Sequence, residues 1–463
     1  MQTETIEYSQ NIESTGSNQK LKFKEKFSYG LGNLSANLLI TTANTFITFY
    51  YTEVAGIAIA IVGTLLLFAR IFDGASDLVM GVVVDKTRTK HGKGRPWLLW
   101  LAIPYGLAII LLFSSPDFSM TGKIIYAFVT YVLAVGVIYT AISVPYNSMT
   151  ALITQNQSDR AQLSGFRTML GFTGAMALTM GTMPIVNFFG GGQKGWTMTS
   201  IIFAVVGIAL YLICFKNTTE RVVPPVESKT AKGNVKTSIV SLLKNKYWIM
   251  VMSVMFIGFI NSGLGGINVY YAQYILGNPT YVGIIGLASF LPIILGTFIV
   301  SPIIGKFGKR NMTIYGTILS IIGSLIIAIN PSSFLFVVTG LVVRGLGLAP
   351  LLVASFAMLG DTIEYGEWKT GIRSEGLAFS AGTFGEKVGT GVGGALIGVI
   401  LGAAGYIGGQ AEQGAGVLNS IQFVFTYLPI LFSIITLIIL YFYKLDKEYP
   451  FILKELNERK RTI

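Results

Sequence analysis

Residues that build metal sites and disulfide bonds are almost absent from this sequence. Its 463 residues include one cysteine, Cys214, and one histidine, His91. A single cysteine excludes a disulfide within the chain, and the Cys and His spacing of a structural zinc site does not occur. Neither a nucleophile–base pair nor an ATP-binding motif is visible. We therefore expect no cofactor, no structural metal ion and no enzymatic activity.

Charged residues are scarce as well. They make up 12% of the chain, whereas hydrophobic residues make up 52%, and soluble domains carry about 25% charge. The composition is therefore that of an all-α protein that crosses a lipid bilayer many times. The net charge of +12 comes from basic residues in loops beside apolar segments, so it gives no reason to expect a nucleic-acid partner.

Long apolar segments are abundant, and twelve of them can each span a bilayer as a helix. Their approximate limits are 28–52, 57–84, 95–115, 122–152, 162–189, 197–215, 246–276, 280–304, 311–329, 333–360, 376–403 and 417–443. The sequence therefore predicts an all-α membrane protein with twelve transmembrane helices.

Basic residues mark the loops that stay inside the cell. They gather in segments 85–96, 216–246 and 305–311, while the alternating loops carry few. Both termini are therefore expected in the cytoplasm. The expected parts are a disordered N-terminal tail (1–26), a six-helix bundle (27–215), a cytoplasmic middle loop (216–245), a second six-helix bundle (246–443) and a C-terminal tail (444–463).

A charged cluster inside the second apolar segment is the strongest indication of function. Arg70, Asp73 and Asp77 recur at one-turn spacing, and at about 100° per residue they share one helix face. An ionised group at membrane depth is costly unless it is paired, hydrated or bound to an ion. A structural Arg–Asp pair would account for one carboxylate and leave the other unexplained. We therefore predict a cation site at Asp73 and Asp77.

Several motifs occur in the order typical of a known transporter family. Segments 81–86 and 305–310 occupy equivalent places in the two halves and resemble the loop signature of the major facilitator superfamily. The other motifs are segments 29–30, 69–77, 93–97 and 361–376. Together they resemble the glycoside–pentoside–hexuronide:cation symporters of that superfamily over residues 24–445.

The resemblance implies two six-helix halves with the substrate held at the midplane, and uptake of a sugar or glycoside coupled to H⁺ or Na⁺. It places the coupling cation on Asp73 and Asp77, with Ser76 and Thr140 as neighbours. No other metal is expected. The candidate substrate-binding residues are Asn37, Arg70, Tyr139, Asn147, Arg167, Thr383 and Lys387.

Three positions depart from the family's galactoside-binding pattern. Asn37 and Ser143 stand where that pattern has aspartates, and Asn147 stands where it has a tryptophan. Fewer carboxylates favour H⁺ over Na⁺, because a proton needs one carboxylate and Na⁺ needs several oxygen ligands. The first expected substrate is a β-xyloside, a xylo-oligosaccharide or a β-glucoside. A hexuronide or glucuronide is the alternative, since Arg167 and Lys387 can receive a carboxylate.

A charged segment follows the tenth apolar segment, and we interpret it as a loop. Its residues Asp361, Glu364 and Arg373, together with Arg160, are expected to form a cytoplasmic gate. Ion pairs near water break and form at low cost, which suits a gate. The alternative is a solvated loop without that role.

These observations predict a secondary active sugar:cation symporter in the bacterial inner membrane. We expect it to work as a monomer, with a sugar or glycoside, the cation and the lipid bilayer as its partners. An exporter of drugs or other amphiphiles is an alternative, which predicts an apolar cavity and tolerance to the loss of one carboxylate. Another is a transport-like sensor that binds sugar and moves nothing.

Overall fold

The structure is a computed structural model that describes residues 20–222, 235–372 and 374–461. All regular elements of these residues are helical, and the one β-bridge joins Thr89 to Gly92. The chain divides into two compact units. The first contains Met1–Ile57 and Phe72–Ser228, and the second contains Ala58–Ile71 and Lys229–Ile463.

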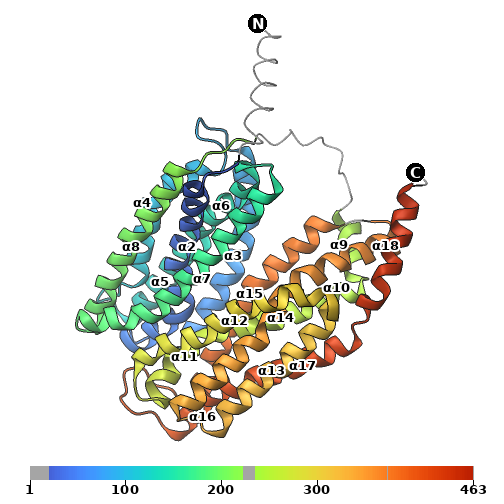
Figure 1. Ribbon diagram of the computed structural model, residues 1–463. Helices are drawn as coiled ribbons and strands as arrows, with labels where there is room; N and C mark the ends of the chain where they lie inside the picture. The colour runs from blue at the N-terminus through green and yellow to red at the C-terminus, as the bar shows by residue number, and fades with distance from the viewer. Residues whose placement is uncertain (1–19, 223–234, 373, 462–463) are drawn as a thin grey trace. The chain divides into compact units, whose positions relative to one another are not determined.

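The first unit is built from helices at the blue to green end of the colour bar in Figure 1. Helix α2 packs against α7 and α8, and α4 packs against α8. The elements are α2 (Phe23–Phe49), η1 (Tyr50–Val54), the later part of α3 (Ile59–Lys86), α4 (Arg95–Leu112), α5 (Met120–Tyr131), η2 (Val132–Tyr139), α6 (Thr140–Ile153), α7 (Gln157–Phe188) and α8 (Gly192–Asn217).

The second unit contains the beginning of α3 and the rest of the helices. Helix α14 packs against α12, α13 and α18, and α10 packs against α15. The elements are α9 (Val235–Leu243), α10 (Lys246–Gly263), η3 (Leu264–Gly266), α11 (Ile267–Tyr270), η4 (Tyr271–Ile275), η5 (Pro279–Tyr281), α12 (Val282–Phe307), α13 (Lys309–Ile329), α14 (Phe334–Thr370), α15 (Glu375–Ala403), α16 (Ala415–Gln422), η6 (Phe423–Tyr427), α17 (Leu428–Phe442) and α18 (Leu445–Arg461).

Eleven helical stretches of the described residues are long and apolar enough to cross a membrane. The remaining expected segment forms α2 and η1, a continuous helix that is long enough but more polar. Polar side chains of α2, such as Ser35 and Thr42, are buried inside the unit, so this helix needs fewer apolar residues than one surrounded by lipid. The predicted all-α fold with twelve transmembrane helices is confirmed.

Some segments expected to be irregular are helical. Helix α14 continues to Thr370 and ends at Gly371, whose φ of +72° is the left-handed conformation that commonly ends helices. Asp361 and Glu364 therefore lie on a helix, and their assignment to a loop was wrong. Part of the expected C-terminal tail forms α18, and the last residues of the expected N-terminal tail begin α2. Residues 1–19 of that N-terminal tail lie outside the described residues.

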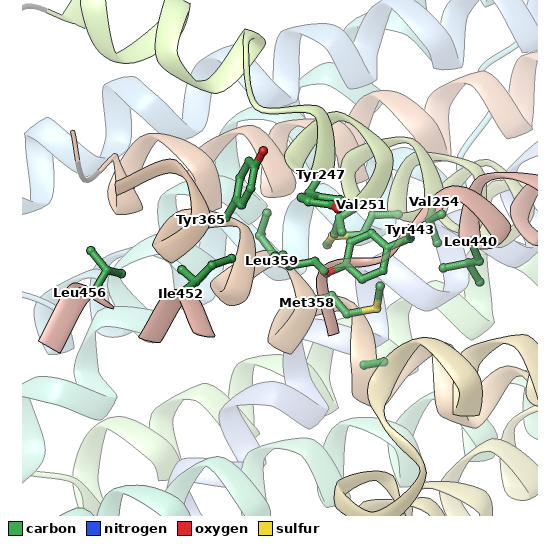
Figure 2. Packing of buried hydrophobic residues seen from close by; sticks show 13 residues of the cluster. Tyr247, Val251, Val254, Met358, Leu359, Tyr365, Leu440, Tyr443, Ile452 and Leu456 are labelled. Carbon is green, nitrogen blue, oxygen red and sulfur yellow. The ribbon is translucent and has the colours of Figure 1, made fainter. Parts of the chain in front are cut away.

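A buried cluster shows how α18 is attached to the second unit (Figure 2). The Tyr247 ring of α10 lies edge-on to Tyr365 of α14, with ring centres 4.9 Å apart. It meets Tyr443, just before α18, in the same way at 5.4 Å. Ile452 and Leu456 of α18 are buried in this cluster. The hydrophobic contacts explain why this segment folds as a helix against α14 rather than extending into water.

Candidate functional site

The predicted cation ligands of the first unit lie where α3 meets the junction of η2 and α6. Asp73 of α3 has a relative exposure of 0%. Thr140, the first residue of α6, donates a hydrogen bond from Oγ1 to Asp73 Oδ1 at 2.8 Å. Asp77 follows Asp73 by one turn of α3 and is half-buried. The structure therefore brings Asp73, Ser76 and Thr140 together, with Asp77 on the adjacent turn.

Gly136 is a member of this cluster that the sequence did not indicate. The Ser76 hydroxyl oxygen lies 2.6 Å from the Gly136 carbonyl oxygen and 2.8 Å from that of Asp73. It also lies 3.4 Å from Thr140 Oγ1. A β-carbon at position 136 would be 2.9 Å from the Phe72 ring. A larger residue here, one turn before Thr140, would push against the Phe72 ring, so glycine favours the close approach of η2 to α3.

The cluster contains the oxygen atoms that bind hard cations. It combines the Asp73 carboxylate, the hydroxyls of Ser76 and Thr140 and the carbonyl oxygen of Gly136. Within the described part of the chain, no three His, Cys, Asp or Glu side chains form a metal-binding group. Oxygen ligands of this kind suit an alkali cation or a proton on the carboxylate more than they suit a transition metal.

Candidate sugar contacts of the first unit come from four elements, α2, η2, α6 and α7. Asn37 of α2 is half-buried, and its Nδ2 donates to the Asn33 carbonyl at 2.8 Å. The Arg167 guanidinium of α7 lies over the Tyr146 ring, 5.9 Å from its centre. Tyr139, the last residue of η2, is half-buried. Asn147 is exposed on α6, two turns after Thr140.

Asn33 is a second residue that the sequence did not indicate. Its Nδ2 donates to the Arg167 carbonyl at 2.9 Å and so joins α2 to α7. Asn33, Asn37 and Thr41 are spaced by four residues along α2, and this spacing was the available signal.

The remaining substrate candidates belong to the second unit. Arg70 is buried, at 6% exposure, in the part of α3 that this unit contains. A β-carbon on Gly391 of α15 would be 2.7 Å from Arg70 Cβ, so the two helices are closely packed there. Lys387 lies one turn before Gly391 and is half-buried. Thr383 lies one turn earlier still, is exposed, and donates to the Ser380 carbonyl.

The gate residues that the structure describes have partners within their own units. Lys309 Nζ lies 2.7 and 2.5 Å from the two Asp361 carboxylate oxygens. Tyr449 of α18 donates to the Glu364 carboxylate, and burial and this carboxylate raise the pKa of Tyr449, which keeps its hydroxyl protonated. Arg160 donates to the carbonyl of Thr154, beyond the end of α6. Arg373 lies outside the described residues, and the gate stays a prediction.

Comparisons with known proteins are consistent with this architecture. A family described as MFS/sugar transport protein matches residues 28–447. The isoprimeverose transporter of Lactiplantibacillus pentosus is 37% identical, with 94% of this chain and 92% of the relative covered. The inner membrane symporter YicJ of Escherichia coli K12 is 30% identical, with 90% and 91% covered. The glucuronide carrier protein homolog of the same organism is 29% identical, with 96% and 98% covered.

Two kinds of solved structure share the fold. A bacterial homolog of the human lysosomal transporter Spinster, in an inward-facing conformation, has a TM-score of 0.65 at 16% identity and covers 93% of this chain and 97% of its own. The nucleoside transporter NupG has a TM-score of 0.64 at 13% identity, with 91% and 100% covered. At these identities the likeness shows the fold alone, which is the predicted twelve-helix major facilitator fold.

Proposed function

This chain belongs to the MFS/sugar transport protein family, and from that membership we propose that it imports a glycoside together with a cation. It is a multi-pass membrane transporter of the sugar-transport class. The observation that carries the proposal is the oxygen cluster around the fully buried Asp73. A carboxylate at this depth is costly unless an ion or a proton compensates its charge.

In the proposed mechanism, Asp73 and Asp77 bind the cation, and Ser76 and Thr140 supply neutral oxygen atoms. Cation binding neutralises the carboxylates and favours the conformation that binds sugar. Thermodynamic linkage then makes each ligand increase the affinity for the other. The energy comes from the ion gradient, and two six-helix halves (27–215 and 246–443) alternate the access to the site.

The coupling ion is H⁺ or Na⁺, and two observations favour different ions. Asn37 and Ser143 stand where carboxylates occur in the galactoside-binding pattern, which favours H⁺. The Gly136 carbonyl and the Thr140 hydroxyl lie beside Asp73 and Ser76, which favours Na⁺ because it needs several oxygen ligands. Uptake that collapses with a protonophore and ignores Na⁺ indicates H⁺. Uptake that Na⁺ stimulates with the protonophore present indicates Na⁺.

The proposed substrate is a neutral pentoside or β-glucoside, with xylosides first. The isoprimeverose transporter, at 37% identity, supports this choice, because isoprimeverose joins xylose to glucose. A hexuronide is the second candidate. The glucuronide carrier protein homolog and the cationic side chains of Arg167 and Lys387 support it.

The remaining proposals concern orientation and partners. Helix ends beside the basic segments 85–96 and 305–311 face the cytoplasm, as do both termini, and the protein acts as a monomer in a bacterial inner membrane. Arg160, Asp361, Glu364 and Arg373 remain the proposed residues of a cytoplasmic gate. We propose that the Lys309–Asp361 ion pair belongs to this gate.

Counterflow in proteoliposomes tests the function directly. Vesicles loaded with unlabelled isoprimeverose, xylobiose, cellobiose or a glucuronide should take up the labelled form of the same compound, and protein-free vesicles should not. Binding of sugar without flux would indicate a sensor. Efflux of amphiphilic dyes without sugar counterflow would indicate an exporter.

A further inference from the structure

The structure assigns Asn33 a role as a positioning residue for the substrate site, acting through Arg167. This inference rests on the proposed function and on the prediction that Arg167 is a substrate-binding residue. Asn33 itself does not need to touch the substrate. Its side chain fixes α7 against α2 at the level of Arg167 by one hydrogen bond, from Asn33 Nδ2 to the Arg167 carbonyl oxygen at 2.9 Å.

The acceptor of this bond is a carbonyl inside a long helix. In an α-helix the Arg167 carbonyl accepts the N–H of residue 171, and a carbonyl oxygen has a second lone pair that can accept from Asn33. The bond therefore joins two helices without breaking either. Asn33 is half-buried, where exchange with water competes less with such a bond than on an open surface.

Gly171 provides independent support for this role. A β-carbon at position 171 would collide with the Asn33 amide nitrogen, which is the nearest atom to that position. By contrast, a β-carbon on Gly165, in the same helix, would have nothing within 4 Å. The absence of a side chain at 171 therefore makes room for the Asn33 amide on α7.

The Asn33 carbonyl is also the first acceptor in a series of side-chain hydrogen bonds along α2. Asn37 Nδ2 donates to the Asn33 carbonyl at 2.8 Å, and Thr41 Oγ1 donates to Asn37 Oδ1 at 2.8 Å. These bonds fix the orientation of the Asn37 amide. They leave it one N–H and one oxygen lone pair, which is the pair of groups that a sugar hydroxyl can use.

The other side of Arg167 is fixed by a rigid aromatic pair. Its guanidinium lies over Tyr146, whose ring stacks on Tyr29 with centres 4.7 Å apart. Tyr146 donates to the Tyr29 carbonyl at 2.6 Å, and the Tyr29 hydroxyl is hydrogen-bonded to Thr150 at 2.6 Å. A shift of α7 against α2 would therefore displace Arg167 from this pair. Substrate affinity should fall more than the turnover rate.

Two substitutions and two matched controls test the inference. Asn33→Leu removes the amide and keeps the volume, while Gly171→Ala displaces the amide by a different route. Ser35→Ala removes a bond of the same kind on the same helix, from Ser35 Oγ to the Gly207 carbonyl at 2.9 Å. Gly165→Ala adds a methyl group to α7 in open space. Initial rates of glycoside uptake in proteoliposomes give KM and Vmax, and a cation titration gives the half-activating concentration.

We expect both test variants to raise KM about three- to tenfold, with Vmax changed less than about twofold, as for the loss of one hydrogen bond that aids binding. The half-activating cation concentration should not change, and both controls should keep the KM of the unaltered protein. Unchanged KM in Asn33→Leu and Gly171→Ala, while Arg167→Ala loses uptake, would overturn the inference alone. Absence of glycoside transport by the unaltered protein would instead overturn the proposed function.

Discussion

The two units hold their basic turns in the same way. In the first, the Glu220 carboxylate accepts the backbone N–H groups of Lys93, Gly94 and Arg95 at the start of α4, at 2.7 to 2.8 Å. In the second, Asp446 accepts the backbone N–H of Arg310 near the start of α13, at 2.8 Å. Each acid follows the last membrane helix of its unit and lies at a helix N-terminus, where the helix dipole favours negative charge.

One arginine in each turn also makes an equivalent hydrogen bond. The Arg95 guanidinium donates to the Phe215 carbonyl near the end of α8, at 2.8 Å. The Arg310 guanidinium donates to the Leu440 carbonyl near the end of α17, at 2.7 Å. Both acceptors are carbonyls of the last helical turn, where the usual N–H from four residues further on is missing. The two units therefore stabilise the starts of α4 and α13 and the ends of α8 and α17 in the same way.

The units differ in the ionisable groups inside their helices. The first unit buries the Asp73 carboxylate beside hydroxyl and carbonyl oxygens. The second contains Arg70, buried against α15, and the half-buried Lys387. We call the surroundings of Asp73 the anionic interior and those of Arg70 and Lys387 the cationic interior, although the first unit also contains the Arg167 guanidinium. Under the proposed function, this difference would place the coupling chemistry in side chains rather than in the shared scaffold, and four predictions test it.

The largest effect is expected from removing the charge of the anionic interior. Asp73→Asn and Asp77→Asn should each abolish gradient-driven accumulation, because an amide neither takes a proton at neutral pH nor binds a cation as a carboxylate does. Downhill exchange of sugar should survive. The measurement is accumulation ratio and counterflow in the same vesicles. Asp117→Asn, at an exposed position, is the control, and undiminished uphill uptake in both test variants would remove the cation site.

The next effect concerns the cationic interior. Lys387→Ala should reduce uptake by about tenfold or more, because this half-buried lysine is a candidate substrate-binding residue and an ionised group inside a membrane helix is expected to be functional. The apparent cation affinity should change with it. Lys447→Ala, on the exposed side of α18, should be neutral.

A second substitution separates a structural role of Lys387 from a role in coupling. Adding Asp73→Asn to Lys387→Ala removes one negative charge along with the positive one, so it should restore protein yield without restoring accumulation. Kinetics like those of the unaltered protein in Lys387→Ala alone would show that the lysine takes no part in transport.

A smaller effect is expected where the anionic interior depends on close helix packing. Gly136→Ala would put a β-carbon 2.9 Å from the Phe72 ring and separate Ser76 from the Gly136 carbonyl. We expect the half-activating cation concentration to rise about five- to tenfold, as for a lost hydrogen bond to a charged site. Gly81→Ala on α3, where nothing lies within 4 Å, is the matched control. Equal values for the two variants would exclude Gly136 from the cation site.

Much of this fold was predictable because lipid restricts a membrane chain to apolar helices. The charged cluster at Asp73 and Asp77 was also visible, since its cost in a bilayer demands an explanation. Gly136 was not visible, and the four-residue spacing of Asn33, Asn37 and Thr41 was only a weak signal for Asn33, because the importance of both residues lies in contacts between helices distant in sequence. The π-helical turn η2 also places Gly136, and apolar periodicity alone does not reveal such a turn.

The charged end of α14 shows a different reason for error. Asp361 and Glu364 suggest a solvated loop, but Lys309 and Tyr449 compensate them, so the helix continues. The signal for its true end was Gly371, a common residue at the end of a helix.

The smallest effect is expected from Glu220 and Asp446, the two acids that accept backbone N–H groups of the basic turns, and it concerns stability rather than transport. Glu220→Gln should lower the free energy of unfolding by about 2 kcal/mol, because the carboxylate serves three N–H groups and charged hydrogen bonds contribute about 1.5–3 kcal/mol. Asp446→Asn, where one backbone N–H is served, should lower it by about 1 kcal/mol. The midpoint of unfolding in SDS measures both, with the exposed Glu412→Gln as control. If either substitution abolished coupling in a protein that remained folded, the turns would take part in transport and the proposed separation of scaffold from chemistry would be wrong.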